Sequence, residues 1–363
     1  MTSARYNLCS ILLGELECIP NHNSGKGKRM KKVKRFICIL LTLLLTAGAF
    51  SEAAMNENQG LFKVSTVQAA ENAGSYTGWK TVAGKRKYYQ NGKLKTGFCK
   101  IENEYYCFDT KGNMRTGWQY VGKRYHYFDK KTGKMKTSTT VQGRKIDSKG
   151  VWTPVVVLDP GHSGKVTGGY EPIGPGARER KSKDTSGAQG CVTRVNEYQL
   201  TLKIAKKLQA ELKKQGYKVI LTRKDNKTAI SCVQRAKIAN KAKADVYLRI
   251  HANDVDFSSA KGALTISVSR RNRFVSSKMA KKCYALSKAV LDSYVKATGC
   301  RREYIWENDS MSGNNWSKVP TTLIELGYMS NPTEDRKMQS ASYQKKMVKG
   351  LADGIRKYLI AAK

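Results

Sequence analysis

A short motif that recurs within residues 76–150 limits what this part of the chain can fold into. Threonine, glycine and an aromatic residue occur together at Thr77–Trp79, Thr96–Phe98 and Thr116–Trp118, at intervals of 19 and 20 residues. Each copy is followed by an aromatic cluster and then by a glycine suited to a turn, which is typical of a short β-hairpin. A single hairpin cannot bury a core, whereas stacked hairpins can. We therefore predict a small all-β solenoid of hairpin repeats over residues 76–150.

The pattern changes after Thr153, where short apolar runs begin to alternate with amphipathic segments. Leucine and isoleucine recur every four residues in Asn196–Gln215, which predicts a helix, and Gly216 is a typical residue to follow its end. The predicted strands are Val155–Leu158, Lys218–Thr222, Val246–Ile250 and Thr321–Leu326, and the other predicted helices are Ala229–Lys241, Ser277–Lys296 and Tyr343–Leu359. This alternation predicts an α/β domain over residues 153–363, with a mostly parallel sheet covered by helices on both faces.

Two of the four histidines lie at equivalent places in this second domain. His162 follows the first predicted strand, in the sequence LDPGHSG, and His251 directly follows the strand Val246–Ile250, in YLRIHAND. Because ligands of open α/β sheets bind at the carboxyl ends of the strands, we expect the two imidazoles to share one edge and to form part of a metal site. A structural role for each histidine is the alternative.

Two glutamates are candidates to complete such a site, since a hydrolytic zinc site needs three protein ligands and a base. Glu197 begins the helix Asn196–Gln215, so its carboxylate can point at the sheet edge. The alternative is an acidic residue that only favours the helix N-terminus. Glu325 lies within the apolar strand Thr321–Leu326, where burial would make the carboxyl group a suitable general acid–base. The alternative for Glu325 is a buried ion pair.

The motifs around these residues resemble the zinc-dependent N-acetylmuramoyl-L-alanine amidases of the Amidase_3 type. The resemblance covers nearly all of residues 153–360 and is carried, in order, by LDPGHSG, NEYQLTL, Arg-x-x-x-Ala-Asn, RIHAN and LIELGYMSNPTED. It implies one Zn²⁺ ion held by His162, Glu197 and His251, with Glu325 as the catalytic carboxylate. It also implies a peptidoglycan hydrolase that cleaves the amide bond between N-acetylmuramic acid and the L-alanine of the stem peptide.

Two other functions remain compatible with these residues. One is a zinc peptidase that cuts within the stem peptide, since the scissile bond is set by substrate pockets that the motifs do not describe. The other is a non-catalytic wall-binding scaffold or adhesin. The complete set of two histidines and two glutamates argues against a scaffold, because a domain without catalysis has no chemical need for all four.

The repeat region resembles the cell-wall-binding repeats of the choline-binding type. In that family, aromatic faces between neighbouring hairpins bind choline, or glycans in some branches. Here Lys87, Tyr105 and Tyr125 stand where tryptophan is common in the family, and the region is strongly basic, which favours an anionic wall polymer over choline. The aromatic residues that we expect to face a ligand are Trp79, Tyr89, Phe98, Tyr106, Trp118 and Tyr127.

The charge of the chain and its one long apolar run indicate where it acts. Lys and Arg number 67 against 28 Asp and Glu, a formal net charge of +39, which favours a polyanionic partner. The basic segment Lys31–Arg35 precedes an uncharged apolar run at residues 36–50, which is typical of a secretory signal peptide, with an uncleaved anchor as the alternative. Export argues against nucleic acid as a partner and limits membrane contact to the signal peptide. We expect a secreted, cell-wall-associated protein of a Gram-positive-type envelope.

The beginning of the chain and its cysteines allow two further predictions. We expect translation to start at Met30, so that residues 1–29 are a non-native extension and residues 30–70 are signal peptide and linker. Six cysteines follow the predicted cleavage region, an even number that permits disulfides outside the cell. Cys99 and Cys107 flank one short hairpin and are the candidate pair.

Overall fold

The computed structural model describes residues 76–362. The predicted signal peptide, the predicted start at Met30 and the linker up to residue 70 lie outside the described residues and stay predictions. Within the described part, no helix combines the length and the apolar character needed to cross a membrane.

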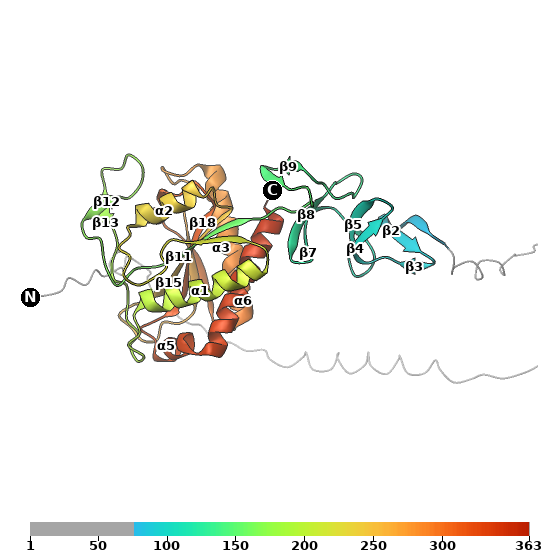
Figure 1. The fold of residues 1–363 in the computed structure, drawn as a ribbon. Coiled ribbons are helices and arrows are strands. Elements are labelled where there is room, and N and C mark those ends of the chain that lie inside the picture. The colour runs from blue at the N-terminus through green and yellow to red at the C-terminus, as the bar shows by residue number, and fades with distance from the viewer. Residues whose placement is uncertain (1–75, 363) are drawn as a thin grey trace, which may run out of the picture. The chain divides into compact units, whose positions relative to one another are not determined.

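The first part of the described chain forms short antiparallel β-hairpins, as the repeat predicts (Figure 1). The strands are β1 (Gly78–Val82), β2 (Lys85–Gln90), β3 (Lys93–Leu94), β4 (Gly97–Ile101), β5 (Glu104–Phe108), β6 (Met114–Arg115), β7 (Gly117–Val121), β8 (Arg124–Phe128), β9 (Thr139–Val141) and β10 (Arg144–Ile146). A side chain on Gly112 would overlap Leu94 of the preceding hairpin, and one on Gly133 would overlap Met114. The repeated glycines thus let each hairpin pack against the one before it. The strands form separate small sheets, and a continuous solenoid stays a prediction.

The second part is built on one six-stranded sheet in the order β14–β11–β15–β18–β16–β17. Its strands are β11 (Val155–Pro160), β14 (Lys218–Leu221), β15 (Val246–Asn253), β16 (Ala263–Ser267), β17 (Arg302–Glu307) and β18 (Thr321–Tyr328). All neighbouring pairs are parallel except β16 and β18, which are antiparallel. The predicted α/β sheet is confirmed in this outline, and the mixed edge formed by β16 and β17 is an addition that the sequence did not predict.

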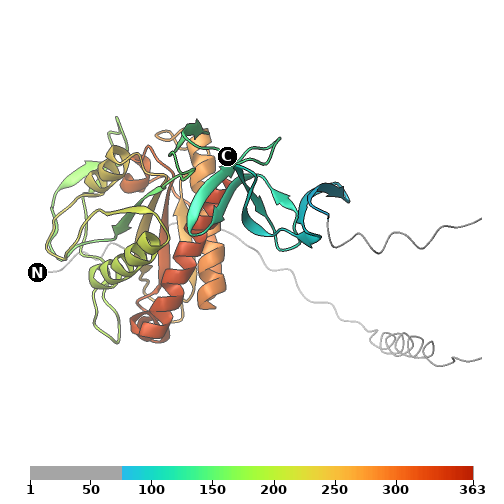
Figure 2. The same ribbon diagram turned by 45° about the vertical axis from the view of Figure 1, so that its right-hand side comes forward.

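Helices cover both faces of the sheet, as predicted (Figures 1 and 2). One face packs against α1 (Glu197–Lys214), α3 (Ser277–Thr298) and α6 (Ala341–Ala361), which together enclose the largest hydrophobic core. The other face packs against α2 (Cys232–Lys241) and the short α4 (Ser312–Asn315). Helix α5 (Pro332–Gln339) follows β18, and a small hairpin of β12 (Tyr170–Pro172) and β13 (Arg180–Ser182) lies between β11 and α1 in the chain.

The start of α1 is fixed by local side-chain chemistry, and this matters because Glu197 is its first residue. The Gln199 side chain accepts a hydrogen bond from the backbone N–H of Asn196 at 3.0 Å. Such a contact satisfies an N–H that lies at the helix start and pins the first turn. At the other end Gly216, with φ of 85°, follows the helix in the left-handed region, as predicted.

The last hairpins pack directly against the α/β part. Trp118, Tyr125 and Trp152 belong to the same hydrophobic core as α1 and α6. The hydroxyl groups of Tyr125 and Tyr217 lie 2.6 Å apart, and the Tyr120 hydroxyl donates to the carbonyl of Gln215 at 3.0 Å. A boundary between two domains near residues 150–153 therefore stays a proposal, because aromatic residues on both sides of it share one core.

Candidate functional site

The structure brings the four predicted site residues together at the carboxyl edge of the central strands. His162 follows β11, His251 lies near the end of β15, and Glu325 lies beside His251 on the neighbouring strand β18, as its register partner. Glu197 reaches the same edge from the first turn of α1. These residues are far apart in the sequence, and the parallel order of β11, β15 and β18 is what collects them.

His162, Glu197 and His251 form a compact cluster of ligand atoms. His162 Nε2 lies 3.1 Å from Glu197 Oε2, and His251 Nδ1 lies 3.1 Å from Glu197 Oε1. The two imidazole nitrogens are 3.2 Å apart. Glu197 and His251 are buried, whereas the His162 side chain keeps 18% of its exposure and opens the cluster to solvent.

This geometry suits a metal ion. Zn²⁺ binds imidazole nitrogen and carboxylate oxygen at about 2.0–2.2 Å, which places the ligand atoms of a tetrahedral site roughly 3.4 Å apart. The observed separations are close to that value. Within the part of the chain that the structure describes, these three residues are the group whose ligand atoms could hold a metal ion.

Glu325 lies beside this cluster with an unused acceptor. Its Oε2 atom is buried and has no hydrogen-bond partner among the described residues. Burial holds the pKa of Glu325 well above its ordinary value, the negative charge of Glu197 raises it further, and Arg249 opposes this shift. A carboxyl group of raised pKa, next to a group that could hold a metal, is equipped to take up and return a proton.

The candidate ligand Glu197 is held in its ionised form by its surroundings. Burial alone would raise its pKa, but the positive charge and hydrogen bonds of His162 and His251 lower that pKa well below the ordinary value. The backbone N–H groups of Ala188 and Ala252 donate to its two carboxylate oxygens at 3.0 and 3.1 Å. Each oxygen is thus oriented by one backbone donor and one imidazole.

The segment between the first two candidate ligands contributes contacts that the motifs did not reveal. His162 Nδ1 lies 2.9 Å from the carbonyl oxygen of Thr185 and 3.0 Å from its hydroxyl. Gly187 packs so closely that a side chain there would overlap both Glu197 and His162. In the sequence this segment, residues 168–194, is rich in Gly, Lys and Arg, and nothing in it singles out Thr185.

A buried network of charged side chains packs beside the candidate metal site. The Asp159 carboxylate accepts hydrogen bonds from Arg235 Nη1 at 2.8 Å and from Arg249 Nε at 3.1 Å. All three side chains are buried. Arg235 also donates to the carbonyl of His162 at 2.9 Å. The arginine of the Arg-x-x-x-Ala-Asn motif therefore fixes the backbone of a candidate ligand.

The motif that follows Glu325 anchors the segment between His162 and Glu197. Asp335 Oδ2 accepts hydrogen bonds from the backbone N–H groups of Val192 and Thr193 at 2.9 and 2.7 Å, and its Oδ1 accepts from the Thr193 hydroxyl at 2.6 Å. Gly190 packs against the same carboxylate, where a side chain would overlap it. Asp335, in α5, thus ties the segment before α1 to the helix that follows β18.

The six aromatic residues predicted to face a wall ligand differ in exposure. Phe98 is exposed and stacks on Tyr105 and on His126, with ring centroids 5.1 and 5.2 Å apart. Tyr106 and Trp118 are buried and pack within hydrophobic clusters. Trp79, Tyr89 and Tyr127 are half-buried. The set as a whole does not form one exposed face, and its role in ligand binding stays a proposal.

The candidate disulfide between Cys99 and Cys107 is wrong for this structure. All six cysteines of the described residues are free thiols. In the β4–β5 hairpin Cys99 lies opposite Tyr106, and Cys107 lies opposite Phe98. Because neighbouring strand residues point to opposite faces, the two thiols project to opposite sides of the hairpin.

Comparison with known families assigns this arrangement to a class. The family model described as N-acetylmuramoyl-L-alanine amidase matches residues 156–357, and a model described as a choline-binding repeat matches residues 95–139. The first match spans more than half of the chain and contains the four predicted site residues. The chain belongs to the N-acetylmuramoyl-L-alanine amidase family.

Individual relatives agree with this assignment. The probable cell wall amidase LytH of Staphylococcus aureus is 27% identical over 206 residues, which cover 57% of this chain and 58% of LytH. The chain thus spans little more than half the length of this curated relative. The apo form of the N-acetylmuramyl-L-alanine amidase Ami1 from Mycobacterium abscessus superposes with a TM-score of 0.52 at 26% identity, over 57% of this chain and 98% of Ami1. Ami1 from Mycobacterium smegmatis shares the fold, with a TM-score of 0.52 at 22% identity over 57% of this chain and 96% of Ami1.

Proposed function

We propose that this protein hydrolyses the amide bond between N-acetylmuramic acid and the L-alanine of the peptidoglycan stem peptide. The observation that carries the proposal is the cluster of His162, Glu197 and His251 with the unpaired carboxylate of Glu325 beside it. Amide hydrolysis needs an activated water, a group that polarises the carbonyl and a proton carrier for the leaving nitrogen. The residues of this edge can supply all three when a metal ion is present.

We assign His162, Glu197 and His251 as ligands of one Zn²⁺ ion. Two imidazoles and one carboxylate with mutual separations of 3.1–3.2 Å are a donor set that would hold a zinc ion. When bound, the ion supplies Lewis-acid activation of the attacking water and of the amide carbonyl. Thr185 holds the far nitrogen of the His162 ring and so orients its Nε2 towards the cluster.

Glu325 is the proton carrier in this proposal. Its carboxylate accepts a proton from the attacking water and returns that proton to the nitrogen of L-alanine as the carbon–nitrogen bond breaks. The products are a muramic acid carboxylate and a stem peptide with a free amine. Burial favours the neutral carboxylic acid of Glu325, which is the form that must donate in the second step.

The hairpin repeats are proposed to hold the enzyme at the cell wall. Peptidoglycan is the substrate, and an anionic or choline-bearing wall polymer is the ligand of the repeats. The choline-binding repeat match and the exposed Phe98–Tyr105 stack support this role. Exposed rings can hold a polymer by stacking and can attract quaternary ammonium groups through their faces. A secreted, wall-associated location is part of the same proposal.

Removal and return of the metal tests the catalytic proposal. The full chain is stripped with a chelator and then titrated with Zn²⁺ while hydrolysis of a soluble muramyl-peptide is followed. We expect activity to fall on stripping and to return at one equivalent of zinc, with zinc content measured on the same samples. Activity that survives complete removal of the metal would overturn the assignment. A zinc-loaded protein that cleaves nothing would favour the wall-binding scaffold.

A further inference from the structure

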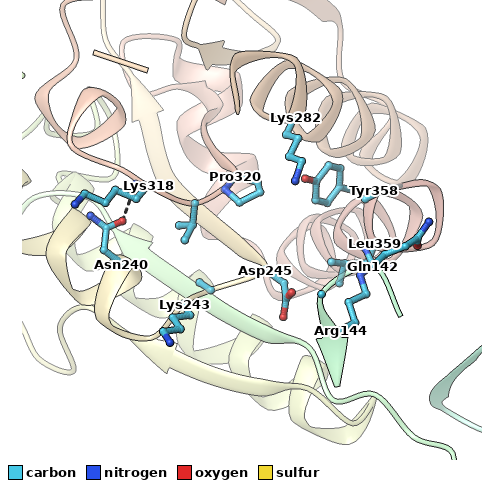
Figure 3. A pocket seen from close by; sticks show the side chains of 14 residues that line it. Gln142, Arg144, Asn240, Lys243, Asp245, Lys282, Lys318, Pro320, Tyr358 and Leu359 are labelled. Carbon is cyan, nitrogen blue, oxygen red and sulfur yellow. Dashed lines mark hydrogen bonds between the residues drawn. The ribbon is translucent and has the colours of Figure 1, made fainter. Parts of the chain in front are cut away.

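A second cavity lies at the opposite edge of the central sheet from the candidate metal site. Its volume is about 400 Å³, and its walls come from the β9–β10 turn, from the loops that precede β15 and β18, and from the C-terminal end of α6 (Figure 3). These loops lie at the amino ends of β15 and β18, whereas His251 and Glu325 lie towards the carboxyl ends of the same strands. The cavity is therefore separate from the site described above.

Three hydrogen-bond donors from three different elements line this cavity. They are Arg144 of β10, Lys282 of α3 and Tyr358 of α6. Arg144 Nη1 is buried and finds no hydrogen-bond partner in the described part of the chain. In Figure 3 the side chains of Lys282 and Tyr358 point towards one another, and neither forms a hydrogen bond or ion pair with a described residue. The cavity thus holds donors that the protein itself does not satisfy.

The charge around the cavity is mostly positive. Lys243 and Lys318 also line it, and Asp245 contributes the one carboxylate among its lining residues. Asp245 Oδ2 already accepts a hydrogen bond from the backbone N–H of Val155 at 2.8 Å, which ties it to the start of β11. Four cationic side chains thus surround a single carboxylate, and the imbalance favours an anionic ligand.

Arg144 is held in place before any ligand arrives. Its guanidinium carbon lies 4.1 Å from the ring centroid of Trp152 and 5.1 Å from that of Trp118. The Trp118 indole N–H in turn donates to the Gln142 side chain at 3.0 Å. Stacking fixes the plane of the guanidinium and leaves its edge for hydrogen bonds, which suits the oxygens of a phosphate group.

We propose that this cavity binds a phosphate group, presented along an anionic polymer of phosphodiester units. Guanidinium, ammonium and phenol donors from separate elements line the same cavity, and donors on different sides suit a tetrahedral oxyanion better than a planar carboxylate. The volume accommodates a polymer unit as well as a bare ion. Because the walls come from both the last hairpin and the α/β part, such a ligand would contact both. The proposal rests on the proposed wall association only for the source of the polymer.

Binding measurements on the full chain test this proposal. Titration calorimetry with a soluble glycerol phosphate oligomer, and separately with inorganic phosphate, gives Kd for the natural chain and for three variants. We expect Arg144→Gln to raise Kd about tenfold or more, since a hydrogen bond to a charged group is lost. Tyr358→Phe keeps the buried ring and is expected to raise Kd about fivefold. Lys130→Gln, an exposed lysine outside the cavity that removes the same charge, is expected to change Kd by less than about twofold.

The outcomes separate this site from general attraction to a basic surface. Selective weakening by Arg144→Gln or Tyr358→Phe supports the cavity, and competition by inorganic phosphate shows that the phosphate group is sufficient. Equal weakening by all three variants, or absence of binding, overturns it. Thermal unfolding of each variant checks that it is folded. If Arg144→Gln does not fold, the Kd of Tyr358→Phe decides whether the cavity binds the ligand. Muramyl-peptide hydrolysis, followed in parallel, reports on the proposed function independently.

Discussion

The two faces of the central strands carry opposite kinds of residues, although the same strands build both. On the face towards α1, α3 and α6, the buried side chains of β11, β15 and β18 are mainly aliphatic, and Thr322, which hydrogen-bonds Ser287 of α3, is uncharged. The aliphatic residues are Val156, Leu158, Leu248, Ile250, Ile324 and Leu326. The alternate positions, on the face towards α2, carry Asp159, Arg249, His251 and Glu325 next to Val157, Tyr247 and Leu323. One face is a hydrophobic core, and the other combines a smaller core with a charge network and the candidate active site.

This difference shows how a parallel sheet can hold a reactive site without losing its core. Strands buried on both faces are usually apolar throughout. The ionisable residues of these strands all lie on one face and therefore need a reason, because each buried charge must be paired or used. Asp159 and Arg249 are paired with each other, whereas Glu325 keeps an unpaired buried oxygen. The unpaired carboxylate is the one that we assign to catalysis.

The largest effect is expected from Glu325→Gln on the polar face. The turnover number should fall by about 10²–10⁴-fold, because glutamine cannot carry the proton. The free energy of unfolding should not fall, since an amide of the same shape replaces a carboxyl group whose burial is costly. Steady-state kinetics and thermal unfolding measure the two effects. Zinc content serves as the control and should be unchanged.

Asp159→Asn, on the same polar face, should lower the free energy of unfolding strongly. The change leaves Arg235 and Arg249 buried without their anion, which costs about 3–5 kcal/mol of unfolding free energy. Denaturant unfolding measures this loss. Asp353→Asn provides the matched control, because its partners Lys349 and Arg356 lie near the surface and the expected loss there is about 0–1 kcal/mol. Equal losses in the two variants would contradict a structural role for the buried network.

Leu248→Ala changes the apolar face at the centre of the sheet. Removing this fully buried side chain should cost about 2–5 kcal/mol of unfolding free energy. The turnover number of the folded fraction should stay within a factor of about two, because no contact to the candidate metal site is lost. Unfolding curves and active-fraction kinetics test both points. A fall in turnover comparable to that of Glu325→Gln would show that the two faces are not separable.

The smallest effect is expected from Thr185→Val, behind His162. The valine removes the hydroxyl near His162 Nδ1 and keeps the backbone carbonyl, so zinc affinity should fall by about tenfold at most. Competition with a chelator of known affinity measures this change apart from activity. Thr132→Val, which removes a hydroxyl in the repeat region, is the control. An unchanged zinc affinity in Thr185→Val would show that the Thr185 hydroxyl does not help to orient His162.

The sequence predicted the central strands and the common edge of the two candidate histidines, because both leave a local signal. The proposed role of Glu197 came from the family resemblance, since an acidic residue at a helix start is not distinctive by itself. An apolar run of β-branched residues marks β11, and Glu325 stands out because its neighbours are all apolar. Strand β16 and the edge strand β17 were not predicted. β17 is half-exposed and carries Arg302, Glu303 and Glu307, so it looks like a loop until it pairs with β16.

Contacts that depend on tertiary structure also escaped prediction. Thr185 reaches His162 through a bend in a glycine-rich segment, and backbone N–H groups such as that of Ala188 carry no side-chain signal at all. The packing of Tyr125 on Tyr217 links residues 92 positions apart in the chain. The aromatic pattern of the repeats gave the hairpins correctly, but pattern alone did not separate buried rings such as Tyr106 from exposed ones such as Phe98.

The most direct test of the account identifies the bond that is cut. The full chain and its Glu325→Gln variant, both loaded with zinc, are incubated with a soluble muramyl-peptide, and the products are analysed by mass spectrometry. The account predicts an intact stem peptide with a free L-alanine amine together with the separated muramic acid portion, and neither product from the variant. Fragments cut within the peptide, or equal product from the Glu325→Gln variant, would contradict it.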